Sequence, residues 1–153
     1  MSNTNRLCIA ACLILAFGHT FDMLVGLDVH RRWDAFGAIA EIYGRWDPGY
    51  VAQPFYMKIT SLTSGLIMLP LTLALAWGFA REAAWRGMVA VFYLGFICCG
   101  NVIWLYNEAM GPVGPESWGW TIGLYLPWQV LPIWLAWVGV RGQRGEKVGF
   151  EGV

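Results

Sequence analysis

Four long segments with almost no charge constrain this chain more than any other feature of its sequence. They cover residues 7–27, 59–79, 84–106 and 118–140. A helix of about 20 residues crosses the hydrocarbon core of a bilayer, because that core is roughly 30 Å thick and each residue adds about 1.5 Å. The segments therefore predict four membrane-spanning helices in an all-α, integral membrane four-helix bundle, which forms one domain over residues 1–141.

The composition also favours the bilayer as the solvent. Of the 153 residues, 58% are hydrophobic and 13% are charged, and ten are tryptophan. A soluble domain of this size would leave many of these side chains facing water. The formal net charge is +0, which gives no overall field to attract nucleic acid. We therefore expect membrane lipid around the chain and no nucleic-acid partner.

The distribution of lysine and arginine predicts the orientation. On one side of the membrane lie the amino-terminal stretch with one of these residues, the second connection and its flank with two, and the carboxy-terminal stretch with three. On the other side, the first connection carries four and the third connection carries none. By the positive-inside rule, both termini lie in the cytoplasm. A secretory signal peptide is the alternative for the first segment, but no small-residue cleavage site follows it.

Two segments outside the spans differ in composition. Residues 28–56 contain seven aromatic side chains, too many for a free linker. We expect this long aromatic-rich loop between the first two spans to lie back over the bundle, or in the membrane interface, as short helices. Residues 142–153 are polar and rich in glycine, and we expect them to form a flexible tail.

The sequence contains no pattern typical of a metal or haem site. The only histidines are His19 and His30, which lie near the same end of one span. The cysteines lack the C-x-x-C spacing of metal sites and thiol oxidoreductases: Cys8, Cys12, Cys98 and Cys99. We expect no metal and no cofactor. The G-x-x-x-G motif of Gly119 and Gly123 is typical of close helix packing, so a homodimer is one arrangement that the sequence allows.

Ionisable side chains inside the spans are the strongest functional signal. Such a side chain costs roughly 2.5–3.5 kcal/mol at the centre of a bilayer on insertion scales, so it generally faces the bundle interior or a wet cavity. His19 and Asp22 are three positions apart and share one face of the first span, where the carboxylate can orient the imidazole. This pair is the candidate proton donor. A pair that only ties helices together is the alternative.

Polar and aromatic side chains share faces of the other spans as well. The candidate lining comprises Asn101, Trp104 and Glu108 on the third span, Tyr125 and Trp128 on the fourth, and Ser61 and Ser64 on the second. For the residues on the second and fourth spans, plain helix packing is the alternative. Together they predict a mostly aromatic intramembrane pocket with a few polar groups. An acid beside aromatic rings suits carbocation chemistry on an apolar alkene, with Glu108 as a second acid or base. Without a competent acid, the same pocket would be a lipid receptor.

Three motifs follow one another along the chain. The first is Tyr43-Gly-Arg-Trp-Asp47-Pro48-Gly-Tyr50 with Lys58 and Pro70 downstream, the second runs from Gly100 to Glu108, and the third is Tyr125-x-Pro127-Trp128 with Pro132. In order and spacing they resemble the EXPERA family, which contains the emopamil-binding sterol isomerases and the sigma-2 receptor. The resemblance covers residues 17–140 and implies a four-span bundle, often dimeric, with a sterol-sized cavity.

Emopamil-binding isomerases move a sterol double bond by protonation and deprotonation. By resemblance, His19 matches their first-helix histidine and Trp128 matches the tryptophan that faces the cation. Asp22 lies one position nearer to the histidine than their first-helix glutamate. Their second-helix glutamate falls at Ser61 and their fourth-helix asparagine falls at Tyr125, so the chain departs from the isomerases at both positions.

The sigma-2 branch is similar at other positions. Asp28 and Asp47 resemble its two aspartates near the loop, where the resemblance implies that Asp28 lies nearer the ligand. It implies a structural role for Asp47, together with Pro48 and Tyr50. The acidic residue that this branch carries on its second helix falls at Ser64, so the chain combines features of both branches.

The sequence therefore predicts an integral membrane isomerase that protonates a sterol or other isoprenoid, with His19, Asp22 and Glu108 as catalytic residues. The alternative is a non-catalytic membrane protein that binds sterols, lipids and cationic amphiphiles, as the sigma-2 receptor does. A membrane scaffold whose pocket is only packed is a third interpretation. The host membrane is expected to be the endoplasmic reticulum in a eukaryote and the inner membrane in a bacterium.

Overall fold

The computed structural model describes residues 1–45, 47–110 and 118–143. Every regular element in these ranges is helical, and four helical stretches are long and apolar enough to cross a membrane. The spans are α1 (Asn3–Gly26), then α4 (Phe55–Thr63) continued by the π-helical turn η2 (Ser64–Met68) and α5 (Leu69–Ala80), then α6 (Arg86–Met110) and α7 (Trp118–Gln143). The predicted all-helical class, with four helical stretches long and apolar enough to span a membrane, is confirmed for the described residues.

Each span extends three or four residues beyond one end of its apolar segment. α1 begins at Asn3, where the Ser2 hydroxyl oxygen accepts a hydrogen bond from the Asn5 N–H (3.1 Å) and caps the helix. α7 continues to Gln143 and so includes two residues that the sequence assigned to the tail. The rest of that predicted flexible tail, residues 144–153, lies outside the described residues.

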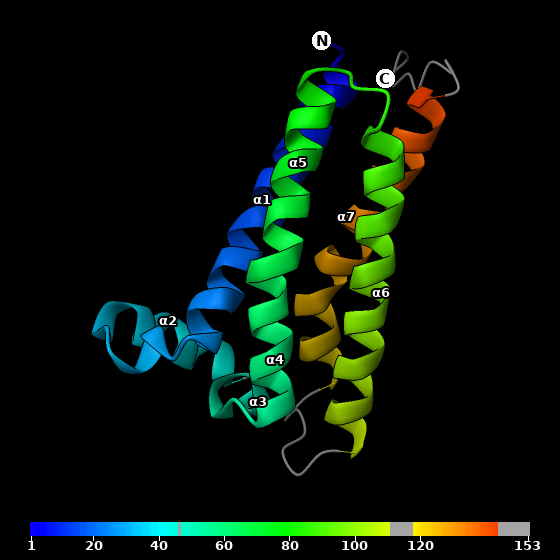
Figure 1. The fold of residues 1–153 in the computed structure, drawn as a ribbon. Coiled ribbons are helices and arrows are strands. Elements are labelled where there is room, and N and C mark those ends of the chain that lie inside the picture. The colour runs from blue at the N-terminus through cyan, green and yellow to red at the C-terminus, as the bar shows by residue number, and fades with distance from the viewer. Residues whose placement is uncertain (46, 111–117, 144–153) are drawn as a thin grey trace.

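The spans pack as two pairs that lie side by side (Figure 1). α1 packs along α4, η2 and α5, and α6 packs along α7. Contacts between α5 and α6 join the two pairs. The start of α1 and the end of α7 lie at the same end of the bundle. The largest buried side chains of the core between the spans include Leu15, Leu75, Phe79, Tyr93 and Leu135.

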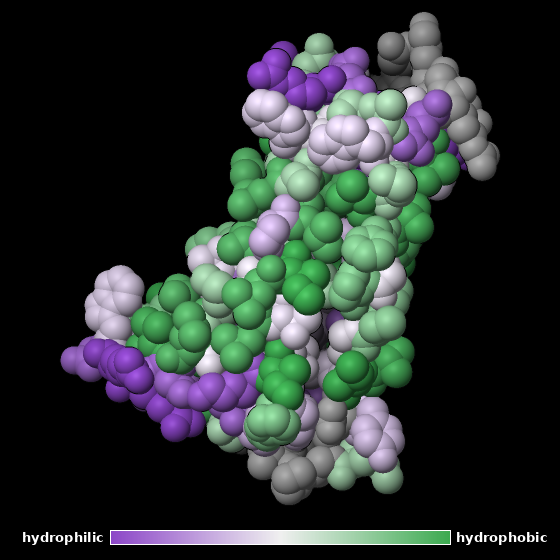
Figure 2. All heavy atoms as spheres, in the orientation of Figure 1, coloured by the Kyte–Doolittle hydropathy of each residue, from purple (hydrophilic) through white to green (hydrophobic). Residues whose placement is uncertain are grey.

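The outward faces of the spans are apolar. Leu13, Phe17, Leu66 and Phe92 each expose about half or more of their surface. Hydrophobic residues cover the middle of the molecule in Figure 2, and hydrophilic residues gather toward its two ends. Soluble monomers rarely expose a continuous apolar surface of this kind, so the outer face suits hydrocarbon as its solvent.

The second span changes its hydrogen bonding just before Pro70. Proline has no N–H to donate, and its ring crowds the carbonyl group four residues earlier. The Leu69 N–H instead bonds to the Ser64 carbonyl, five residues back, so the turn between them is π-helical. Turns of this kind are frequent at functional sites, and this one presents Ser64 to α1.

Gly65 in the same turn lets the second span approach α1 closely. A Cβ atom at Gly65 would lie 2.3 Å from the Cβ of Met23. No side chain fits there without moving one helix away from the other.

Gly65→Ala is therefore expected to destabilise the protein by about 1–3 kcal/mol, the usual cost of overpacking. Gly95→Ala is the matched control, because a Cβ at Gly95 on α6 would meet no atom of the described chain within 4 Å. The control should be neutral or should stabilise the helix by about 0.5–1 kcal/mol. Thermal unfolding of both variants in detergent measures the difference. Equal stability of the two variants would contradict the close contact.

The Gly123 end of the G-x-x-x-G motif does not pack against another helix among the described residues. A Cβ at Gly123 would meet no described atom within 4 Å. The close approach of α6 and α7 lies instead at the other end of α7, where a Cβ at Gly139 would lie 2.9 Å from the Gly87 Cα. A homodimer through Gly119 and Gly123 stays a prediction.

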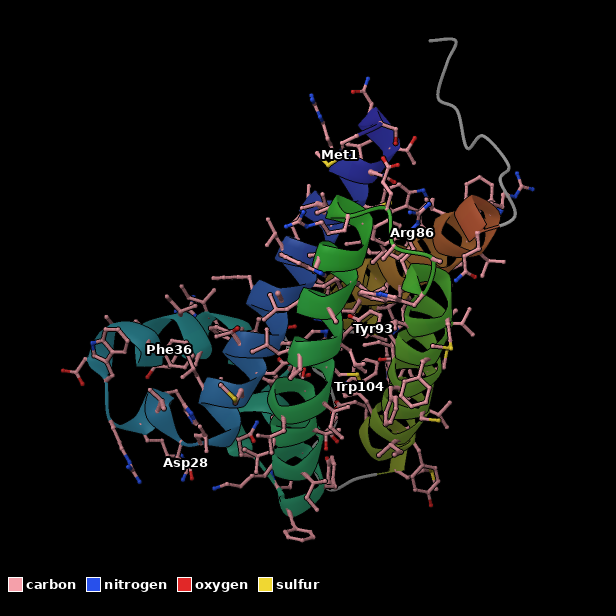
Figure 3. The ribbon with its side chains drawn as sticks, turned by 45° about the horizontal axis from the view of Figure 1, so that its top comes forward. Met1, Asp28, Phe36, Arg86, Tyr93 and Trp104 are labelled. Carbon is pink, nitrogen blue, oxygen red and sulfur yellow. The ribbon has the colours of Figure 1, made fainter. Side chains whose placement is uncertain are left out.

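Between α1 and α4 the chain forms three short helices, η1 (Val29–Arg31), α2 (Asp34–Gly44) and α3 (Pro48–Ala52). α2 extends sideways from the bundle, across the direction of the spans (Figures 1 and 3). Aromatic side chains from this region join a second buried cluster with residues of the spans: Val25, Phe36, Tyr50, Met57 and Trp104.

Candidate functional site

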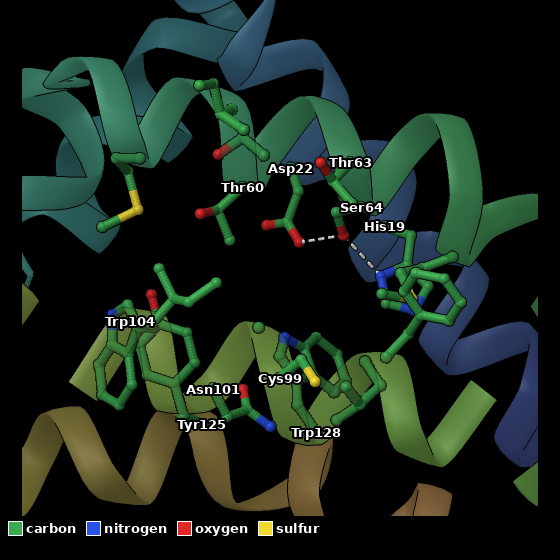
Figure 4. Close-up of a pocket in the computed structure, with 18 of the residues that line it drawn as sticks. His19, Asp22, Thr60, Thr63, Ser64, Cys99, Asn101, Trp104, Tyr125 and Trp128 are labelled. Atoms are coloured by element: carbon green, nitrogen blue, oxygen red, sulfur yellow. Dashed lines mark hydrogen bonds between the residues drawn. The ribbon is translucent and has the colours of Figure 1, made fainter. Parts of the chain in front are cut away.

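A cavity of about 320 Å³ lies beside the carboxy-terminal half of α1 (Figure 4). Its walls come from α1, α3, α4, η2, α6 and α7, and most of its lining is apolar. Its size falls within the range of small-molecule sites. The structure brings together at this cavity the predicted residues His19, Asp22, Tyr50, Ser61, Ser64, Asn101, Trp104, Tyr125 and Trp128.

Asp22 holds two hydrogen bonds at the cavity wall. Its Oδ2 accepts from the Ser64 hydroxyl at 2.7 Å, and its Oδ1 accepts from the Tyr50 hydroxyl at 2.6 Å. The carboxyl group is thus fixed from two sides, by η2 and by α3. A carboxylate held in this way has a defined direction toward the cavity.

His19 is joined to Asp22 through Ser64 rather than directly. The His19 Nδ1 lies 2.7 Å from the Ser64 Oγ, and its Nε2 lies 2.7 Å from the Tyr93 hydroxyl. One continuous chain of hydrogen bonds therefore runs from Tyr93 on α6 through His19 on α1, Ser64 on the second span and Asp22 to Tyr50 on α3. Figure 4 shows its central part.

Tyr93 is the member of this chain that the sequence did not reveal. It is fully buried on α6 and points into the bundle (Figure 3). A single tyrosine in an apolar segment is usually an ordinary packing residue of a membrane helix. Only the structure shows whether its hydroxyl has a hydrogen-bond partner on another helix. Its position opposite His19 depends on how α6 packs against α5, which in turn packs against α1.

The opposite side of the cavity is aromatic. The ring centroids of Trp104 and Tyr125 lie 4.1 Å apart, with 34° between the ring planes. Trp128 fills the space left by Gly18, where a Cβ would lie 2.4 Å from its ring. The Asn101 Nδ2 has no hydrogen-bond partner among the described residues, so it is available to a polar group of a ligand.

Asp47 ties the short helix α3 to the bundle. It is fully buried, and it accepts hydrogen bonds from the Tyr50 N–H (3.0 Å) and the Tyr125 hydroxyl (2.8 Å). Pro48 occupies the first turn of α3, where its missing N–H costs nothing. Burial raises the pKa of the Asp47 carboxyl above its ordinary value, and the hydrogen bond from Tyr125 acts in the opposite direction.

Two of the residues predicted to act in catalysis or substrate binding do not line the cavity. Glu108 is buried, and neither of its carboxyl oxygens has a hydrogen-bond partner among the described residues. Asp28 lies at the end of α1, where it pairs with Lys58 and, at 3.7 Å, with Arg31. The hydrogen bond from Lys58 lowers the pKa of the Asp28 carboxyl. Of the three predicted catalytic residues, only His19 and Asp22 lie together.

The cavity combines a carboxyl group and a linked imidazole, which can exchange protons, with a mostly apolar lining. Asp22 faces a space bounded mainly by apolar and aromatic side chains, and a hydrogen-bonded chain connects it to an imidazole. No cluster of three or more histidine, cysteine, aspartate or glutamate side chains within the described ranges is arranged to hold a metal ion.

Comparison with protein-family models, curated proteins and solved structures finds no match to this chain.

Proposed function

We propose that this chain is an integral membrane isomerase of the emopamil-binding type, which protonates a C=C bond of a sterol or other isoprenoid. The observation that carries the proposal is the Asp22 carboxyl group at the wall of an apolar cavity, linked through Ser64 to His19. The rings of Trp104 and Trp128 line the same cavity. An acid and aromatic faces in one apolar space are what carbocation chemistry requires.

The proposed reaction begins with a protonated Asp22. Its proton moves to one carbon of the double bond, and the other carbon becomes a carbocation, which aromatic faces stabilise by roughly 0.5–2 kcal/mol each. A neighbouring carbon then loses a proton to the Asp22 carboxylate, which forms the shifted double bond and restores the acid. One proton is added and one is removed, so the reaction needs no cofactor. The apolar lining keeps water from trapping the cation.

Glu108 has no direct role in this proposal, because it does not line the cavity. The acid and the base are both Asp22, which acts with His19.

One position supports the proposed relation to the EXPERA family. The sigma-2 branch carries an acidic residue where this chain has Ser64, and the Asp22 carboxylate lies 2.7 Å from the Ser64 hydroxyl. We propose that Asp22 on α1 supplies the carboxyl group that the second-helix acidic residue supplies in the sigma-2 branch. With this relation we propose both termini in the cytoplasm, in the endoplasmic-reticulum membrane of a eukaryote or the inner membrane of a bacterium.

The alternative function is a non-catalytic receptor for sterols, lipids and cationic amphiphiles. The observation that favours it is the same Asp22 carboxylate, which offers a ligand amine an ion pair beside aromatic rings. Asp28 is already paired with Lys58, so Asp22 is the carboxylate left for this role. Amine binding that survives neutralisation of both Asp22 and Asp28 would exclude it.

The test uses purified protein in lipid vesicles with Δ8-sterols and linear isoprenoids. Chromatography with mass spectrometry should show a product of unchanged mass and a shifted double bond. His19→Ala should remove this activity while the fold stays intact, as checked by cooperative thermal unfolding of the variant. An active His19→Ala protein would contradict the assignment, and bound but unchanged sterol would favour the receptor.

A further inference from the structure

We propose that Ser64 is a proton bridge between Asp22 and His19, and that His19 acts on the substrate only through this bridge. The catalytic role of the bridge rests on the proposed function, whereas the hydrogen bonds that form it do not. In this proposal Asp22 is the catalytic residue, whereas Ser64, His19 and Tyr93 are positioning residues.

Both ring nitrogens of His19 already have partners. Nδ1 lies against the Ser64 hydroxyl and Nε2 against the Tyr93 hydroxyl, each at 2.7 Å. His19 itself is 3% exposed and Tyr93 is fully buried, so neither bond faces solvent. The imidazole therefore has no free N–H for a substrate, and the carboxyl group of Asp22 is the acid that remains at the wall.

The hydroxyl of Ser64 can bridge in either direction, because it has one proton to donate and lone pairs to accept. When Asp22 is ionised and His19 is an imidazolium, Ser64 donates to Asp22 and accepts from Nδ1–H. When Asp22 is protonated and His19 is neutral, Ser64 accepts from Asp22 and donates to Nδ1, while Nε2–H donates to Tyr93. Both arrangements satisfy every hydrogen bond and contain the same number of protons.

Two protons move when one arrangement converts to the other. The Nδ1 proton passes to the Ser64 oxygen as the Ser64 proton passes to the Asp22 Oδ2. The imidazolium becomes neutral, the carboxylate becomes a carboxylic acid, and no heavy atom has to move. His19 thus stores the proton that makes Asp22 an acid.

Histidine ring nitrogens report this coupling directly, since the chain contains only His19 and His30. Protein labelled with ¹⁵N-histidine gives ring signals whose shifts depend on which nitrogen carries a proton, and His30→Gln identifies those of His19. We expect Asp22→Asn to change the His19 signals in protein that retains Ser64. In a Ser64→Ala background, Asp22→Asn should leave them unchanged, and Ser64→Thr should restore the effect because it keeps the hydroxyl.

Two results would overturn the bridge. One is an equal effect of Asp22→Asn on His19 with and without the Ser64 hydroxyl, which would mean coupling through space. The other is no effect in either background. Turnover provides a separate readout: Ser64→Ala should lower it by about 10²-fold and Ser64→Thr should recover it. Spectral coupling in a protein without isomerase activity would retain the bridge and reject only the proposed function.

Helix α2 supports a second and independent inference, which concerns the membrane surface. One face of α2 packs against the protein through Phe36 and Ala40, which are buried. A second apolar face carries Ile39 and Ile42, which are 54% and 51% exposed. A helix with protein on one side and water on the other needs only one apolar face.

We infer that this second face lies in the bilayer. α2 runs across the direction of the spans, and in Figure 2 the hydrophobic residues in its region adjoin those of the spans, while hydrophilic residues line the outer edge. The charged side chains of Asp34 and Glu41 are exposed. This arrangement places α2 at the boundary between headgroups and acyl chains, with Ile39 and Ile42 toward the acyl chains.

Spin labels in lipid vesicles test this placement. Cys98 and Cys99 are exposed and are replaced by alanine, whereas Cys8 and Cys12 are buried. Labels are then attached at Ile39→Cys, at Glu41→Cys, and at Leu13→Cys as the lipid-facing reference. Oxygen concentrates in lipid, so relaxation of the spin labels by oxygen should be strong at positions 39 and 13. Relaxation by a water-soluble nickel complex should be strong at position 41. Strong nickel relaxation at both 39 and 41 would overturn the inference.

Discussion

Asp22→Asn is expected to lower turnover by about 10²–10⁴-fold, the usual contribution of general acid–base catalysis. The amide has the shape of the carboxylic acid but cannot transfer a proton to an alkene carbon. One oxygen remains to accept a hydrogen bond from Tyr50 or Ser64, so the chain of hydrogen bonds around His19 loses little structure. Product formation, measured together with the unfolding temperature, separates the lost acid from a lost fold.

The matched control is Asp28→Asn at the end of α1. Asp28 is also an aspartate, but it forms ion pairs with Lys58 and Arg31 and does not line the cavity. Turnover of this variant should stay within a factor of about two of the wild type, because surface ion pairs contribute little. Equal losses in the two variants would mean that charge in general, rather than the acid in the cavity, supports activity.

Asp47→Ala is expected to reduce the free energy of unfolding by about 2–4 kcal/mol. The substitution removes the cap of α3 and leaves the buried hydroxyl of Tyr125 without its acceptor. It also removes the link between α3 and α7. Because Tyr50 on α3 positions Asp22, turnover should fall too.

Asp47→Asn is the control for this prediction. Asparagine is also a good helix cap. Burial already raises the pKa of the Asp47 carboxyl, so the site tolerates a neutral group better than an exposed aspartate site would. We expect it to keep most of the stability that Asp47→Ala loses, as measured by thermal unfolding in detergent. Similar losses in the two variants would show that the ionised carboxylate is essential to the link.

The sequence predicted those parts of this molecule that depend on local periodicity. The four spans follow from unbroken apolar segments, and the shared face of His19 and Asp22 follows from a spacing of three in one helix. The same reasoning placed Asn101 and Trp104 on one face of α6, and both line the cavity.

Glu108 was predicted to share a face with Asn101, near the far end of the third span. Glu108 lies seven residues after Asn101, so it shares that face but is displaced along the axis by about 10 Å. Glu108 is not among the residues that line the cavity.

Contacts between helices could not be read from spacing. The hydrogen bonds of Ser64 to His19 and Asp22 depend on how the second span packs against α1, which the spacing within a single helix does not give. Tyr93 became part of the site only through the distance between α6 and α1.

The measurement that tests the central claim most directly is deuterium incorporation during reaction in heavy water. Protein in vesicles is incubated with a Δ8-sterol or a linear isoprenoid, and the recovered lipid is examined by mass spectrometry. Our account predicts a product with a shifted double bond that carries deuterium from solvent, and its absence when Asp22 is replaced by asparagine. Recovery of bound, unchanged and undeuterated lipid from the wild-type protein would contradict the proposed chemistry.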